Sequence, residues 1–184
     1  MKILTPLLLC LALLTLTPGC TVYKVAVDER PAEDVMHDER ITFLIKEQFL
    51  EDDLIKYLDF DAASYLGHVY LIGEYESQAQ ADRAVSIARS TEGVKRVTTY
   101  LLPKQEVTGC DTAESLRIQT QLNSALLAND DVYGTNVDVK MAQCRVVLLG
   151  LVGSQHEIDT AVSLAEGVEG VRGVKSFLKV YPGK

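Results

Sequence analysis

The first half of the chain alternates apolar and polar residues in a pattern that predicts five elements. One segment carries apolar side chains at three- and four-residue spacing, as an amphipathic helix does. Two runs rich in β-branched and aromatic residues follow, with a glycine turn between them, and indicate a pair of strands. Ser77 is then expected to cap a helix that Gly93 ends. The predicted elements are a helix at 38–50, strands at 60–66 and 68–75, a helix from 77 and a strand at 94–102.

The second half of the chain repeats this pattern. Residues 69–97 and 146–174 align at a fixed offset of 77 without a gap, and 14 of the 29 positions are identical. A period this long, present twice, indicates two copies of one small domain rather than a solenoid. The fold class is therefore α+β, with two tandem α-β-β-α-β units, each a three-stranded mixed sheet packed on two helices. In the second copy the elements are expected at 112–128, 135–141, 144–152, 154–166 and 171–181.

The front of the chain has the form of a secretory signal. A short basic start precedes the apolar run Ile3–Leu16, whose 14 residues would span about 21 Å as a helix, too short for a bilayer core of about 30 Å. Gly19 directly before Cys20 resembles the lipobox of bacterial lipoproteins, which implies cleavage before Cys20 and its acylation. The alternative is an ordinary secretory signal with a chance cysteine. Thr21 in place of an aspartate favours the outer membrane, by resemblance to the lipoprotein sorting rule.

These segments divide the chain into five parts. They are a signal peptide at 1–19, a lipidated tether at 20–37, a first domain at 38–103, a linker at 104–111 and a second domain at 112–182. Each domain has about 70 residues, close to the lower limit at which a single hydrophobic core keeps a domain folded. Packing of the two copies against each other, or a covalent link, would therefore help both of them.

Charge and cysteine content narrow the possible functions. The chain has 26 acidic and 18 basic residues, a net charge of −8, which argues against a nucleic-acid partner because phosphate contacts need clustered Lys and Arg. In an exported protein Cys110 and Cys144 are expected to form a disulfide, with free thiols or a redox or metal site as the alternatives. The three histidines have no second ligand at helical spacing. No metal site and no cofactor are expected.

No group of residues predicts catalysis. Ser77 and Ser154 lie outside any G-x-S-x-G motif and are interpreted as helix caps. The acidic pairs after the first helix of each copy lack the spacing of a calcium loop and are interpreted as solvated turns. What the two copies share is apolar pattern and turn chemistry, so an enzyme is not expected.

The repeated motif resembles a known family. Val69–Gly73 followed by Gly93-Val94, and Val146–Gly150 followed by Gly170-Val171, resemble the BON domain. Two such copies behind a lipoprotein signal are similar to the dual-BON outer-membrane lipoproteins of Gram-negative bacteria. The resemblance implies a non-enzymatic protein that associates with anionic phospholipid and maintains envelope integrity. In the best-known type, the first helix of the second domain meets the lipid.

Two surfaces are candidates for contact with lipid or with a partner. On the helix at 115–127, Ile118, Leu122 and Leu126 share one face and predict the core side. The opposite face could meet lipid, the other domain or a protein partner. Along the last strand, basic and aromatic residues alternate and could meet anionic head groups, or Phe177 could cover the sheet while the lysines reach outward. The candidate residues are Leu116, Thr120, Asn123 and Leu127 on the helix and Lys175, Phe177 and Lys179 on the strand.

The sequence therefore predicts a periplasm-facing lipoprotein, anchored in the outer membrane by acyl chains on Cys20. Its function would be to bind anionic phospholipid, envelope proteins or both, and so to maintain the envelope. The alternative is a chaperone-like or docking module whose partner is protein and whose anchor serves only localisation.

Overall fold

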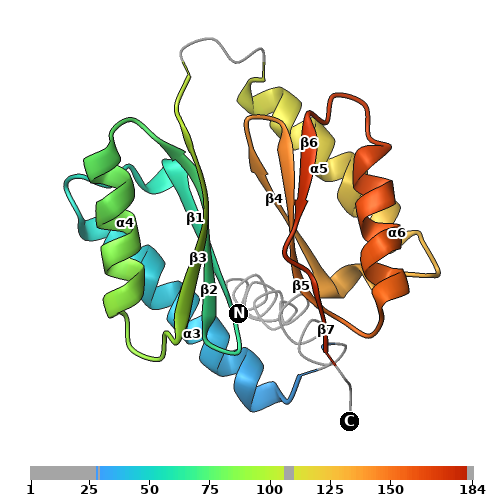
Figure 1. Cartoon of the computed structure of the whole chain (residues 1–184), viewed down its shortest axis with the longest axis horizontal. Helices are drawn as coiled ribbons and strands as arrows, with labels where there is room; N and C mark the ends of the chain where they lie inside the picture. The colour runs from blue at the N-terminus through green and yellow to red at the C-terminus, as the bar shows by residue number, and fades with distance from the viewer. Residues whose placement is uncertain (1–27, 29, 106–109, 182–184) are drawn as a thin grey trace, which may run out of the picture.

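The computed structural model describes residues 28, 30–105 and 110–181. The expected signal peptide, Cys20 and half of the expected tether lie outside the described residues. In the described part of the chain, no helix combines the length and the apolar character needed to cross a bilayer. Figure 1 shows two α+β units whose sheets face each other, with the helices on the two outer sides.

The first unit has the predicted order of elements. Its sheet has the order β1-β2-β3, with β1 antiparallel and β3 parallel to the central β2. One face of the sheet packs on both helices around a core that contains Ile45, Phe49 and Leu71. The elements are α3 (Ala32–Glu51), η1 (Tyr57–Asp59), β1 (Phe60–Tyr65), β2 (His68–Tyr75), α4 (Gln78–Ser90) and β3 (Arg96–Pro103).

The second unit repeats this topology around its central strand β5. Strand β4 pairs antiparallel with β5, and both β6 and β7 pair parallel with it. The core on the helix side contains Ile118, Leu122 and Leu148. The elements are α5 (Thr112–Leu127), η2 (Gly134–Asn136), β4 (Val137–Ala142), β5 (Arg145–Val152), α6 (Gln155–Glu166), β6 (Gly173–Ser176) and β7 (Lys179–Val180).

Positions that are identical in the two copies of the repeat have structural roles. Gly73 and Gly150 have φ of 153° and 142°. A Cβ atom at either would lie 2.0 Å from a backbone carbonyl oxygen of the preceding 3-10 helix, so only glycine fits. The Ser77 side chain accepts from the backbone N–H of Gln80, and that of Ser154 from Glu157. The two predicted helix caps are confirmed.

Several predicted boundaries were wrong. Helix α3 begins at Ala32 rather than at residue 38, so it includes part of the expected tether, and Asp38 lies buried in its interior instead of at its start. Helix α4 ends at Ser90 with Thr91 as its C-cap, and Gly93 lies in the turn beyond, with φ of 86°.

The last strand of the second unit is also shorter than predicted, because it is interrupted between β6 and β7. Backbone hydrogen bonds to β5 continue beyond both segments, from the Phe177 N–H to the Leu148 carbonyl and from the Tyr181 N–H to the Val152 carbonyl. The alternation of side chains therefore persists. Leu178 points to the helix side, and Phe177 and Tyr181 to the other face.

Candidate functional site

The two domains pack together through the sheet faces that carry no helices. We call this interface the seam. Central strands β2 and β5 are apolar on both faces, so each sheet needs a second cover besides its helices. Ile72 is 1% exposed and Leu149 fully buried because the opposite sheet covers them. The seam also contains Ala63, Tyr65, Tyr70, Ala142, Val147 and Leu151.

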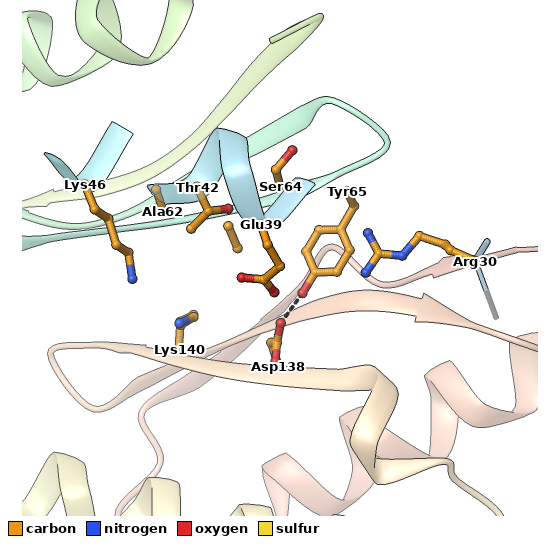
Figure 2. Close-up of a pocket in the computed structure, with 10 residues that line it drawn as sticks. Arg30, Glu39, Thr42, Lys46, Ala62, Ser64, Tyr65, Asp138 and Lys140 are labelled. Atoms are coloured by element: carbon orange, nitrogen blue, oxygen red, sulfur yellow. Dashed lines mark hydrogen bonds between the residues drawn. The ribbon is translucent and has the colours of Figure 1, made fainter. Parts of the chain in front are cut away.

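A polar cavity opens on the α3 side of the seam. It has a volume of about 160 Å³, and Figure 2 shows side chains of α3, β1 and β4 directed into it. Lys46 of the first domain and Lys140 of the second both contact Asp61, each at 2.6 Å. Burial would raise the pKa of Asp61, but the two ammonium groups more than offset it and hold that pKa below its usual range. The charges of the cavity pair with one another and link the domains.

Tyr65 makes a second polar link across the seam. Its hydroxyl donates a hydrogen bond to the Asp138 carboxylate of the second domain (Figure 2). Burial and the nearby Asp138 raise the pKa of Tyr65 well above 10, so the phenol keeps its proton. The Arg30 guanidinium lies over the Tyr65 ring, 5.1 Å from its centroid.

Asp38 fixes the turn between β1 and β2. Its carboxylate accepts hydrogen bonds from the Ser64 hydroxyl at 2.7 Å and from the backbone N–H groups of Leu66 and Gly67 at 2.6 and 2.8 Å. It also pairs with Arg30 at 2.5 Å. The sequence pattern places Asp38 at the first position of a helix and indicates no role for Arg30. No local pattern joins a helix residue to a turn 28 positions later.

Two cations meet at one histidine, at the end of the seam next to this turn. The His68 Nδ1 lies 3.1 Å from the Arg96 guanidinium and 3.1 Å from the Lys179 ammonium, and Nε2 lies 2.8 Å from the Thr98 hydroxyl. Arginine and lysine can only donate, so Nδ1 must accept and the proton is on Nε2. Burial, followed by the charges of Lys179 and Arg96, lowers the pKa of His68 to about 4. The ring is neutral at neutral pH.

The other strand candidates lie beside this histidine. The Phe177 ring is 5.3 Å from the Tyr70 ring of the first domain and belongs to the seam. The exposed Lys175 ammonium lies 5.1 Å from the Phe177 ring, and the Lys179 ammonium 5.8 Å from the Tyr70 ring. The strand candidates therefore form one aromatic and cationic group, and Phe177 serves in it as a packing residue.

The helix candidates lie on the outer surface of α5. Leu116 is 61% and Leu127 66% exposed, and Thr120 and Asn123 are exposed as well. The predicted core residues Ile118, Leu122 and Leu126 are buried. Because the domains meet through their sheets, the first domain does not cover this face.

A disulfide links the start of the second domain to its hairpin. Cys110 and Cys144 are bonded, with their Cα atoms 5.8 Å apart. Cys110 precedes α5, where Asp111 caps the helix by accepting from the Glu114 N–H, and Cys144 lies in the turn between β4 and β5. Among the residues that the structure describes, no three His, Cys, Asp or Glu side chains gather as a metal site would need.

The fold therefore defines a tandem-domain protein with two α-β-β-α-β units. The BON domain family matches the chain at residues 37–102 and 115–182, one match in each unit. The chain belongs to the BON domain family.

Three relatives are between 28% and 36% identical to this chain. Osmotically-inducible protein Y of Escherichia coli is 36% identical over 150 residues, which cover 78% of this chain and 73% of that protein. Outer membrane lipoprotein DolP of Haemophilus influenzae is 29% identical over 164 residues, 89% of this chain and 83% of that one. The 21 kDa hemolysin of Actinobacillus pleuropneumoniae is 28% identical over 159 residues, covering 84% and 78%.

Proposed function

We propose that this protein is a lipoprotein of the bacterial outer membrane, held there by acyl chains on Cys20 and facing the periplasm. The lipobox-like Gly19-Cys20 supports the anchor. The similarity to a protein named as an outer membrane lipoprotein supports the location. Two acyl chains suffice for stable attachment to a bilayer, whereas one gives only reversible binding.

We further propose that the protein acts by binding and not by catalysis. Ser77 and Ser154, one of the serine pairs that recur in the repeat, are occupied as helix caps. At the seam cavity, Lys46 pairs with Asp61 within the first domain, and Lys140 pairs with the same carboxylate across the domains. This arrangement suits a rigid binding module whose role is to maintain the cell envelope through contacts with phospholipid.

The observation that carries this proposal is the uncovered outer face of α5. Two leucines of this one helix are more than 60% exposed, whereas the inner sheet faces of both domains pack together. Helix α3 also exposes large apolar side chains, Phe43 and Leu50. Exposed apolar side chains held on a rigid scaffold are typical of a contact surface. Leu116 and Leu127 would be its anchors, with Thr120 and Asn123 between them.

Cell fractionation and vesicle binding test the two parts of the proposal. Cys20→Ala should move the protein out of the membrane fraction, and native protein that fractionates unchanged without an acyl adduct would contradict the anchor. The Cys20→Ala chain should sediment with vesicles that contain phosphatidylglycerol more strongly than with phosphatidylcholine alone. Equal sedimentation with both would contradict the contact with anionic phospholipid.

A second candidate function is docking of an envelope protein on the α5 face. The observation that favours it is the charge of this face, since its four residues include no lysine or arginine. A face without cations has no electrostatic attraction to an anionic lipid surface. If Leu116→Asp/Leu127→Asp impairs the cell envelope as loss of the protein does but leaves vesicle binding unchanged, the α5 face binds protein.

A further inference from the structure

The cluster of Arg96, Lys179 and His68 has an unusual balance of charge. The chain carries a net charge of −8, and most cations of the seam cavity pair with carboxylates. Arg96 and Lys179, both exposed, instead approach one neutral imidazole, and within the described residues neither forms an ion pair with a carboxylate. Two cations that converge on one uncharged atom repel each other, so an anion placed between them would be stabilised by both.

The cluster is preorganised. His68 begins β2 in register with Arg96 of β3, and Lys179 is held by the pairing of β7 with β5. The His68 ring stacks on Tyr70, with centroids 4.2 Å apart, and Nε2 is tied to Thr98. His68 thus acts as a positioning residue for both cations. A guanidinium beside an ammonium suits a phosphate, because arginine can bind two phosphate oxygens while lysine supplies a point charge.

The position of the N-terminal segment indicates where this phosphate comes from. Asp28 bonds to Arg30, and Arg30 pairs with Asp38, which holds the β1–β2 turn directly before His68. The chain therefore leaves the described body toward Cys20 at the same end as the cluster. In Figure 1 the start of α3 and β7 lie at this end, opposite the interdomain linker.

Asp28 comes only eight positions after Cys20. Fully extended, they reach at most about 28 Å. An acylated Cys20 would keep the cluster close to the membrane surface and raise the effective concentration of lipid head groups around it.

We propose that Arg96 and Lys179, positioned by His68, bind the phosphate of an anionic phospholipid head group in the membrane that holds the anchor. This inference rests on the proposed function, and it adds to the apolar α5 face a second contact, at the anchored end of the seam, that recognises the anionic head group.

The test compares vesicle binding of charge-matched variants in the Cys20→Ala full chain. The measured quantity is the ratio of affinities for vesicles with and without phosphatidylglycerol, because apolar contributions of the N-terminal segment cancel in this ratio. Arg96→Gln/Lys179→Gln should reduce the ratio by about thirtyfold, since each cation near an anionic surface contributes about fivefold. Arg89→Gln/Arg145→Gln removes two exposed cations elsewhere and should change the ratio less than threefold, by the same scale.

Further variants separate the possible outcomes. Arg96→Lys/Lys179→Arg keeps the charge and should keep most of the binding, which shows that the loss in the glutamine variant does not come from misfolding. Equal losses in both charge-matched pairs, or no loss in Arg96→Gln/Lys179→Gln, would overturn the inference. Inorganic phosphate at constant ionic strength is the probe for a free anion. If Arg96→Gln/Lys179→Gln abolishes binding of inorganic phosphate but leaves the vesicle ratio unchanged, the inference is overturned, because the site then serves a free anion. If the parent chain shows no preference for phosphatidylglycerol, the proposed lipid contact itself is wrong.

Discussion

Individual residues of this protein have roles that depend on partners far away in the sequence. Asp38 is a residue of helix α3, yet its carboxylate accepts hydrogen bonds from backbone N–H groups of the β1–β2 turn and forms an ion pair with Arg30. His68 is a strand residue whose pKa is lowered first by burial and then by cations from the far end of the second domain and from β3. In both cases the chemical type of the side chain is ordinary, and its neighbours give it its role.

The depressed pKa of His68 predicts a pH dependence of stability. The unfolded chain binds a proton at His68 below about pH 6.5, the ordinary pKa, whereas the folded ring does so only near its pKa of about 4. The contribution of neutral His68 to the free energy of unfolding is therefore fully present above pH 6.5 and is lost as the pH falls from 6.5 toward 4. Thermal unfolding midpoints should drop less between pH 7 and pH 5 in His68→Gln than in the parent. His156→Gln serves as the control and should keep the parental slope.

Helix α5 divides its apolar residues between two opposite faces. Leu122 and Leu126 are buried in the core of the second domain, whereas Leu116 and Leu127 project from the surface. Helical periodicity alone gives both stripes. Burial decides that the first stabilises the fold and leaves the second available for contact.

The two stripes predict different mutational effects. Leu122→Ala should lower the free energy of unfolding by about 2–5 kcal/mol, because it leaves a cavity in a closely packed core. Leu116→Ala should change it by no more than about 0.5 kcal/mol. Chemical denaturation of both variants measures the difference. Similar losses would mean that another part of the protein covers the outer face of α5.

The whole molecule is built around the seam between the two sheets. Each domain has a small core, and the seam adds a third apolar cluster to which both contribute. Polar contacts lie around it. The amide of Gln143 donates to the Pro103 carbonyl at 2.9 Å, and the Lys140 ammonium pairs with Asp61. We therefore expect the two domains to behave as one compact body.

Charges introduced into the seam should separate the domains. Ile72→Asp/Leu149→Asp places two carboxylates among side chains that are at most 1% exposed, where an unpaired charge is strongly unfavourable. Small-angle scattering should show a larger radius of gyration, while circular dichroism retains most of the helix signal. The matched pair Leu116→Asp/Leu127→Asp makes the same chemical change on the exposed face and should leave the radius unchanged. An unaltered radius in the seam variant would show that the sheets do not depend on each other.

The disulfide stabilises the second domain beyond its core. Closing a loop with a sequence separation of 34 contributes about 3–4 kcal/mol by chain entropy. The intact mass should lie about 2 Da below that of the reduced protein, because disulfide formation removes one hydrogen from each thiol. Reductant should lower the free energy of unfolding, while Cys110→Ser/Cys144→Ser should show the lower value in both conditions. Reactive thiols in the folded protein would contradict the bond.

The sequence by itself determined the two-domain α+β organisation and the internal geometry of each unit. The repeat at a fixed offset, the serine caps and the paired glycines are local signals, since each depends on residues only a few positions apart. The glycines at 73 and 150 recur because a side chain at either would collide with a backbone carbonyl. Two apolar stripes on α5 could also be predicted, and the buried one is where the periodicity places it.

Only the tertiary structure decided how the domains meet and which surfaces stay free. The sequence showed apolar residues on both faces of the sheets and on both faces of α5, so several ways to cover them remained open. Sheet-to-sheet packing buries Val147 and Leu149 and leaves Leu116 and Leu127 exposed. It also brings Lys179 to His68 and Arg96, residues more than 80 positions away, to form the cationic cluster. Such contacts depend on a three-dimensional arrangement that no local spacing specifies, because packing is decided between surfaces and not along the chain.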